Sequence, residues 1–427
     1  MQRSTQGNFF LFLSFTLMIT TYLPILTVNM PPLIRSHHLW AAAWFMSVLI
    51  FAPQTLKDNY LIFVLLSGAF LIAVLFNSLY VDVNDWNKGQ AKTEFYMLMV
   101  AISLSAYFRH SSDYGGLAIL LKWTMIFIAI TAVMSIYSSY VDPEYARKLL
   151  NAEFLTDTDT EDLRRFGGGS VGFGGALLIL FPMIVYFYRN SSKCPFSKLQ
   201  ILSFGILSFV TLLMMQFFAF IILVVLVSSF AITGRKNLKR SLLIYTPIII
   251  LLSIIPTEYY SNFIIGISNY YPHGSDTQFK LIDLAKFLEY GGYEGSTGSR
   301  AERYPILFQG LLSNPLLGAF NAVNNEYKAE GAHLYWMNKL TVYGILGFIP
   351  FSLIFYWYIK RVRKMVDSEF GFYFLLSVST GIVLGFMKVL AGREFWYMFF
   401  FILPGFYYLP LAKREKQPKD NIIKPQN

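Results

Sequence analysis

The sequence predicts an all-α polytopic membrane protein with about twelve transmembrane helices and one large, partly helical periplasmic loop. Of the 427 residues, 55% are hydrophobic and only 14% are charged, too few charged side chains to cover a soluble domain. Uncharged runs such as Phe9 to Val28 and Tyr60 to Tyr80 are near the length that a helix needs to cross the hydrocarbon core. The mean hydropathy of +0.48 agrees with a chain that lies mostly in lipid.

The apolar runs predict the positions of the spans. These are roughly 9–28, 39–53, 59–80, 94–108, 115–140, 169–188, 199–214, 217–233, 241–256, 334–358, 370–387 and 394–411. The first run is expected to stay as an uncleaved span, because it is long and ends in a poor cleavage site. The chain then divides into helices one to nine, a large loop, helices ten to twelve and a polar tail. These parts cover 1–256, 257–333, 334–411 and 412–427, with a short external loop at about 141–168 inside the first.

Basic residues between the spans predict which loops are cytoplasmic. The apolar stretch from Leu199 to Thr233 has short, strongly basic flanks, and such loops stay in the cytoplasm. An even number of crossings is therefore required, and two short helices with a tight external turn near Met215-Gln216 satisfy it. The same rule predicts that both termini are cytoplasmic and that the large loop is external. The net charge of +10 is then explained by the membrane and not by nucleic acid.

The large loop at 257–333 carries helical patterning. From Thr277 to Tyr290 the apolar residues share one face, which predicts a short helix on the membrane surface. These residues are Leu281, Leu284, Ala285 and Leu288. A turn-rich stretch at 295–299 follows, and a second helix is predicted at about 301–312. Loops of this length that are folded usually carry function.

An arginine and glycine segment precedes the sixth span. Arg164 and Arg165 run into glycines between Gly167 and Gly175 at the start of a predicted helix. Arginine binds phosphate with paired hydrogen bonds, and a glycine-rich helix N-terminus presents N–H groups to an anion, so this segment is a candidate diphosphate site. Glycines spaced four apart also allow close helix packing, and arginines anchor to headgroups. On residue types alone this second interpretation is slightly favoured.

Few other polar residues are predicted at the outer side. His333 opens the tenth span, where a histidine can act as general base toward a sugar hydroxyl, although an interfacial histidine without a role is the favoured interpretation of this residue alone. The remaining cations are Arg300, Arg303, Lys339, Lys388 and Arg393. Those in spans must face the bundle interior or reach outward to the headgroups. No metal-binding pattern is evident, and no cofactor is predicted.

Three segments, in this order, resemble the O-antigen ligase and O-antigen polymerase superfamily, bacterial membrane glycosyltransferases that use undecaprenyl-diphosphate-linked glycans. The first is Arg164-Arg165-Phe166-Gly167 to Gly175. The second is Ser299-Arg300-x-x-x-Tyr304 followed by Asn314-Pro315-Leu316-Leu317-Gly318. The third is His333 with Gly344 and Gly347. Their order and the predicted topology both match the family pattern.

The resemblance implies a role for each matched residue. Arg164 or Arg165, together with Arg300, would bind the diphosphate, and Arg303 could assist. His333 would be the catalytic base or would orient the acceptor. In this reading the donor sugar is transferred with inversion and without a metal.

Two departures from the family pattern affect these roles. The turn between the paired short spans reads Met215-Gln216-Phe217-Phe218, where the family often has Ser-Arg, and Leu334 follows His333 in place of asparagine. The missing arginine leaves part of the diphosphate charge to be neutralised by other cations. The candidates for this are Lys339, Lys388 and Arg393.

The resemblance implies an enzyme of the bacterial inner membrane with a periplasmic active site. Its partners would be an undecaprenyl-diphosphate-linked oligosaccharide, a glycan or lipid A-core acceptor and the lipid bilayer, with a chain-length regulator as a further candidate. We expect a polymerase of O-antigen or a related surface polysaccharide, because the turn arginine common in ligases is missing. The alternative is a ligase that joins the glycan to lipid A-core. A transporter or flippase for the same lipids is the alternative of another class.

Overall fold

The computed structural model describes residues 5–56, 61–80, 85–142, 145, 166–215, 218–234, 254, 256–271, 273–274, 276–290, 295–318, 334–388 and 392–415, and it contains helices and no strand within them. The long helices are α1 (Thr5–Tyr22), α4 (His37–Phe51), α5 (Leu61–Tyr80), α6 (Asp85–His110), α7 (Tyr114–Val141), α10 (Val171–Arg189), α11 (Lys198–Met214), α12 (Phe218–Thr233), α18 (Tyr335–Met365) and α19 (Ser368–Met387). Short helices α2 (Pro24–Val28) and α3 (Pro32–Arg35) follow α1.

The last apolar segment is irregular. It begins with α20 (Arg393–Tyr397), passes through a π turn at Met398–Ile402, and ends with α22 (Leu409–Glu415). A π turn displaces one carbonyl from the regular pattern, and here the Tyr358 hydroxyl of α18 donates to the Phe400 carbonyl. The irregular stretch is therefore held by a hydrogen bond from a neighbouring helix.

An all-α membrane protein is confirmed by the length and composition of these helices. Five helical segments are long and apolar enough to cross a membrane: α7, α10, α18, α19 and Arg393–Ala412. Shorter apolar helices lie in α4, α5, α11 and α12. Each predicted span inside the described residues overlaps helical structure, but the span at 9–28 is divided into α1 and α2 and the span at 394–411 is irregular. The predicted span at 241–256 lies largely outside the described residues. The count of twelve spans stays a prediction.

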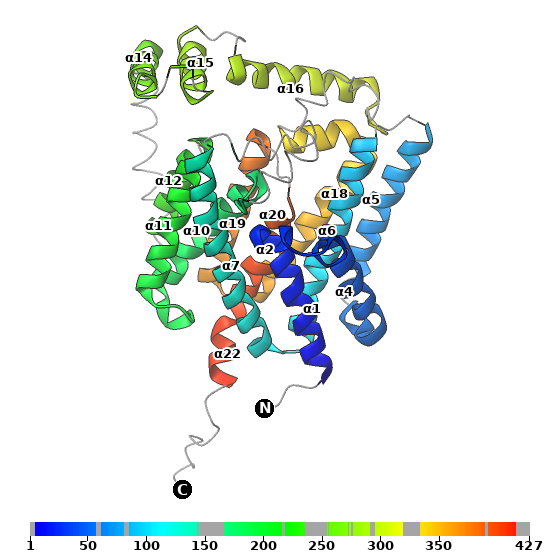
Figure 1. Ribbon diagram of the computed structural model, residues 1–427. Helices are drawn as coiled ribbons and strands as arrows, with labels where there is room; N and C mark the ends of the chain where they lie inside the picture. Colours follow the sequence, from blue (N-terminus) through cyan, green and yellow to red (C-terminus); the bar gives the residue numbers. More distant parts are fainter. Residues whose placement is uncertain are drawn as a thin grey trace.

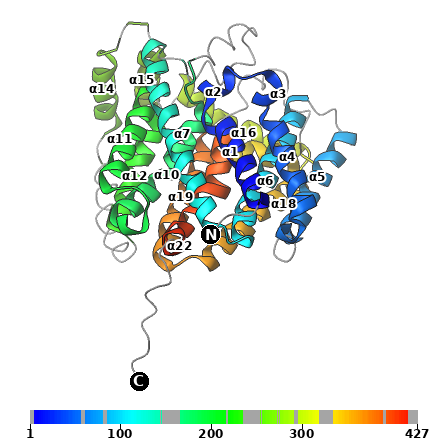
Figure 2. The same ribbon diagram turned by 60° about the horizontal axis from the view of Figure 1, so that its bottom comes forward.

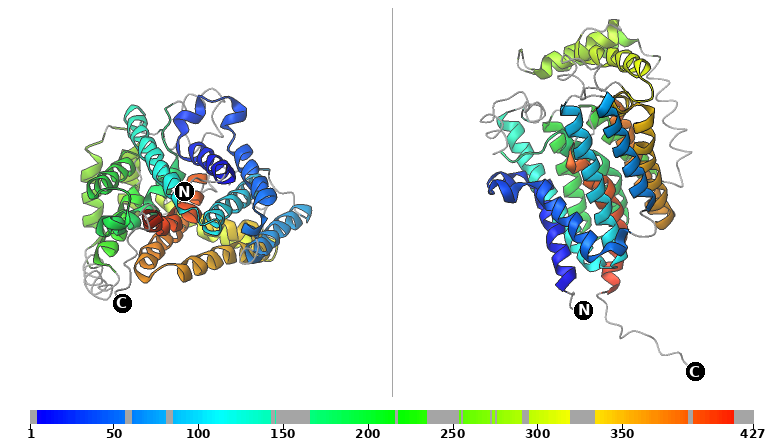
Figure 3. Two further views of the ribbon diagram at one scale, coloured as in Figure 1. Left: turned by 90° about the horizontal axis from the view of Figure 1, so that it is seen from below. Right: turned by 90° about the vertical axis from the view of Figure 1, so that its right-hand side faces the viewer.

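The helices form one bundle with two distinct ends. Helices α14 (Thr257–Ser268), α15 (Asp276–Tyr290) and α16 (Gly295–Ser313) cover one end, and α16 lies across the bundle axis (Figure 1). Helix α1 begins and α22 ends at the opposite end, as the side view in Figure 3 also shows. We call these the covered end and the termini end. Helices α14, α15 and α16 thus lie on the opposite side of the bundle from the start of α1 and the end of α22.

Helix α10 lies at the centre of the bundle. In its apolar stretch 83% of the residues are buried, compared with 44% in α7. It packs against α11, α12, α19 and α20, and Figure 2 shows α10 between α12 and α19. Helices α11 and α12 are antiparallel neighbours separated by a short connection, in agreement with two short helices at 199–233.

The large loop contains more helix than the sequence predicts. Helices at 277–290 and 301–312 are confirmed as α15 and as part of α16, but α16 already begins at Gly295, so the stretch expected to be turn-rich is helical. Helix α14 was not predicted. Helix α15 packs against α14 and α16, with Leu281 and Ala285 buried. Its apolar face therefore contacts protein, whereas the sequence predicted contact with the membrane surface.

Candidate functional site

The residues predicted for the site fall into three groups. Arg164, Arg165 and His333 lie outside the described residues, and only the backbone of Arg300 is described, in α16. The other predicted cations lie at the covered end, on α16 or at the neighbouring ends of α18, α19 and α20. They are Arg303, Lys339, Lys388 and Arg393. What the structure describes of the predicted site is therefore gathered at one end of the bundle.

Helix α16 packs on the bundle along one face. Arg303, Leu307 and Leu311 are spaced four residues apart, and all three are buried. The Thr341 hydroxyl of α18 donates a hydrogen bond of 2.8 Å to the Leu307 carbonyl. This contact fixes the helix that carries Arg300 and Arg303 against the beginning of α18.

A second anchor joins α16 to α19. The Tyr304 hydroxyl donates a hydrogen bond of 2.6 Å to the Phe386 carbonyl near the end of α19. Partial burial raises the pKa of the Tyr304 phenol above its usual value of about 10, so the phenol remains a donor at neutral pH. Together with the Thr341 contact, this bond holds α16 across two helix ends.

Helix α18 is broken at Gly344, where φ is 60° and ψ is −178°. In a regular helix the next two N–H groups would bond to carbonyls four residues earlier. Here Ile345 N–H donates to the Pro315 carbonyl at 2.9 Å, and Leu346 N–H donates to the Leu316 carbonyl at 3.1 Å. The turn after α16 therefore supplies the acceptors that the broken helix lacks.

This junction requires glycine on both sides. A Cβ on Gly344 would lie 2.4 Å from the Gly318 nitrogen, and a Cβ on Gly318 would lie 2.3 Å from the Val342 carbonyl oxygen. Both glycines also have positive φ, which side chains rarely adopt. The structure thus brings together the turn at 314–318 and Gly344, which are parts of the second and third segments singled out in the sequence.

A buried ion pair lies one turn before this break. Lys339 Nζ is 2.7 Å from Glu94 Oε1 of α6, and both side chains are at least nine-tenths buried. The Tyr343 hydroxyl donates to Glu94 Oε2 at 3.1 Å and accepts from Lys339 at 3.2 Å. The Tyr335 ring lies beside the same ammonium group, 5.3 Å from Nζ to the ring centroid. Lys339 faces the bundle interior, and most of its charge is balanced by Glu94.

The start of α20 forms a further polar cluster. The Tyr22 hydroxyl donates to the Glu394 carbonyl at 2.6 Å, which ties the end of α1 to α20. His37 is buried between Thr20 and Tyr397, with Nδ1 2.9 Å from the Thr20 hydroxyl and Nε2 3.2 Å from the Tyr397 hydroxyl. The half-buried Arg393 lies at the first position of this helix. The cluster positions Arg393 at the covered end.

The glycines before and within α10 serve close packing. A Cβ on Gly168 would lie 2.8 Å from the Ser138 hydroxyl of α7, and the Gly169 N–H donates to Ser135 Oγ at 2.7 Å. A Cβ on Gly392 would lie 3.1 Å from the Cα atom of Gly172. The packing interpretation of this segment is therefore supported by the described contacts. The N–H of Gly169 already has an acceptor in Ser135.

Sequence reasoning missed Glu94, Tyr343 and His37. Glu94 was placed at the edge of a span, and its pairing with Lys339 joins residues far apart in the chain. A signal was present, because a lysine inside a predicted span requires a carboxylate or a polar partner elsewhere in the bundle. For His37 the sequence gives no such signal, because nothing near it indicates Tyr397.

At the covered end, the described residues include the cations Arg303, Lys388 and Arg393 in addition to the Lys339–Glu94 pair. Among the residues that the structure describes, no group of three or more metal-ligating side chains is found. Comparisons with protein-family models, with curated proteins and with solved structures found no match to this chain. The functional argument therefore depends on the residues and contacts above.

Proposed function

We propose that this chain is a membrane glycosyltransferase, specifically a polymerase of O-antigen or a related surface polysaccharide. The observation that carries the proposal is the junction between α16 and α18. It joins the helix of Arg300 and Arg303 to the helix that begins directly after His333. Two of the three resembling segments thereby meet through backbone contacts, and the described beginning of α10, which follows Arg164 and Arg165, lies at the same end of the bundle.

In the proposed reaction, the arginines bind the diphosphate of an undecaprenyl-diphosphate-linked glycan. A hydroxyl of a second lipid-linked glycan attacks the anomeric carbon of the donor sugar, the bond from that carbon to the diphosphate oxygen breaks, and lipid diphosphate leaves. His333 accepts the proton of the attacking hydroxyl. The arginines contribute most as negative charge develops on the leaving diphosphate.

The test is transfer by the purified protein with a lipid-linked oligosaccharide as both donor and acceptor. Arg300→Ala and His333→Ala should abolish long glycan chains while the protein stays folded in the membrane. Gln309→Ala is the matched control, because Gln309 is an exposed residue of the same α16 helix. Normal chain-length ladders from both site variants would overturn the assignment.

A ligase and a transporter are separated by related experiments. In a strain lacking the protein, core plus one repeat indicates a polymerase, whereas bare core with accumulated lipid-linked polymer indicates a ligase. The buried Lys339–Glu94 pair favours a transporter, because ionisable groups inside a helix bundle often mark a transport path. Movement of lipid-linked glycan across vesicles without transfer would select that alternative.

A further inference from the structure

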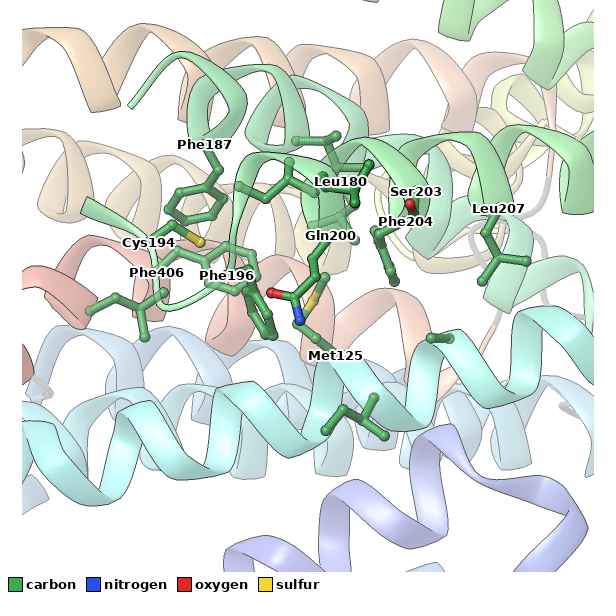
Figure 4. Close-up of a pocket in the computed structure, with 16 residues that line it drawn as sticks. Met125, Leu180, Phe187, Cys194, Phe196, Gln200, Ser203, Phe204, Leu207 and Phe406 are labelled. Carbon is green, nitrogen blue, oxygen red and sulfur yellow. The ribbon is translucent and has the colours of Figure 1, made fainter. Parts of the chain in front are cut away.

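A groove lies between three helices toward the termini end of the bundle. It has a volume of about 420 Å³ and is lined by residues of α7, α10 and α11, of the loop between α10 and α11, and of the last apolar segment at Phe406 and Leu409 (Figure 4). The lining is almost entirely apolar; Leu180, Phe204, Leu207 and Met125 are typical members. Pockets of this size hold small molecules or single hydrocarbon chains.

Gln200 lies toward the termini end of the groove, and Ser203 lies about one turn further along α11 (Figure 4). Gln200 projects into the groove, and its carbonyl oxygen already accepts a hydrogen bond of 2.9 Å from the Ser197 N–H. The Gln200 amide nitrogen, a donor, then remains directed at the groove. Helix α11 begins at Lys198, two residues before Gln200, whereas the apolar Leu207 lies at the other end of the groove (Figure 4).

The groove opens toward lipid. Leu199, which lines it, is 73% exposed, and on the same helix Leu202 and Ile206 are also exposed. On a chain embedded in a bilayer, apolar side chains exposed at this depth contact acyl chains. The space between α7 and α11 is therefore continuous with a surface that hydrocarbon covers.

The length of the groove fits one leaflet. From Lys198 to Leu207 the helix rises about 14 Å at 1.5 Å per residue. Half of a hydrocarbon core of about 30 Å is about 15 Å, so an acyl chain that starts at the level of Lys198 reaches the region of Leu207 near the bilayer centre. The direction also agrees, with the polar end at the end of the bundle and the apolar end inside it.

The charge at the mouth selects the headgroup. Lys198 is exposed, and no ion pair is found for it among the described residues, whereas the nearby Lys193 lies 3.7 Å from Glu369. A lysine at the level of the headgroups attracts anionic lipid. We propose that this groove binds one acyl chain of an anionic glycerophospholipid, taken from the leaflet at the termini end, with its phosphate at Lys198 and Gln200.

This site is separate from the proposed transfer reaction, because it lies toward the end of the bundle opposite α16. The test is native mass spectrometry of the full chain released from vesicles of equal parts phosphatidylglycerol and phosphatidylcholine. We expect one phosphatidylglycerol to remain bound per protein. Lys198→Glu should reduce this occupancy severalfold, whereas Lys360→Glu, a change of an exposed cation on α18, should not.

Filling the groove gives a second test. Ser203→Trp places an indole in the groove and should abolish retention of the lipid. If this variant does not fold, a phosphatidylglycerol with a photoreactive group near the end of one acyl chain replaces it, and crosslinks should map to α7 and α11 around Ala129 and Leu207. Absence of retained lipid, equal retention of phosphatidylcholine, occupancy unaffected by Lys198→Glu, or crosslinks elsewhere would each overturn the proposal.

Discussion

Removing one partner of the Lys339–Glu94 pair should destabilise the protein more than removing both. At the Nζ–Oε1 distance of 2.7 Å and an effective dielectric constant of about 20, the attraction is about 6 kcal/mol. Burying both charges costs free energy of the same order, so the pair as a whole contributes little. An unpaired charge at this depth costs about 3–5 kcal/mol. We therefore expect Lys339→Met or Glu94→Leu to cost about that much, and the double variant far less.

The assay is a double-mutant cycle on the purified protein in detergent, read as the thermal midpoint of the monodisperse fraction. The two single variants should lower the midpoint clearly, and the double variant should recover most of the loss. Tyr343→Phe removes a hydroxyl that bonds two charged groups of the same cluster and should cost about 1.5–3 kcal/mol. Lys360→Met, on the exposed part of the same helix, is the control. If the double variant loses the sum of the single losses, the two charges do not stabilise one another and the reasoning is wrong.

Two further predictions concern α16. Gly344→Ala should lower the thermal midpoint and speed proteolysis between α16 and α18, because its Cβ would meet the backbone of the turn at 2.4 Å; Gly266→Ala, with no atom within 4 Å, should do neither. In a Cys194→Ser background, a spin label at Phe308→Cys should be relaxed strongly by oxygen and only weakly by a water-soluble nickel complex. Phe308 is exposed and lies four residues after Tyr304, on the side of α16 where Tyr304 bonds to Phe386 of α19. A label at Gln309→Cys, which points away from the buried face, should show the reverse, and equal nickel accessibility at the two positions would contradict a membrane-facing side.

The sequence was sufficient for the positions of the long apolar helices and for the pairing of α11 with α12. Long apolar runs specify helices because unsatisfied backbone groups are too costly in lipid. The split of 199–233 into α11 and α12 followed from basic flanks alone, which constrain the parity of crossings. These features depend on local composition, so a single sequence contains them.

The contacts of the candidate site could be predicted only in part. Gly344 and the turn at 314–318 were selected by resemblance, but their mutual contact was not foreseen, because each glycine is required by the backbone of the other and not by its own neighbours. Glu94 was not selected at all. The spacing of apolar and polar residues along α6 does not show whether Glu94 faces Lys339 or lies at the edge of a span. Long-range partners of this kind are specified by packing and not by local pattern.

The break in α18 explains how the segment after His333 is positioned. The piece from Tyr335 to Tyr343 is tied to three other elements: Tyr335 N–H donates to the Lys388 carbonyl after α19, Lys339 pairs with Glu94 of α6, and Thr341 bonds to α16. Beyond the break, α18 packs on α5, where Phe351 lies against Phe70 and Trp357 lies against Phe63. The glycine at 344 lets the first turns keep their contacts with Glu94 and α16 while the rest of the helix packs on α5. The proposed catalytic segment is therefore oriented by the covered end of the bundle, which is also where the arginine helix is anchored.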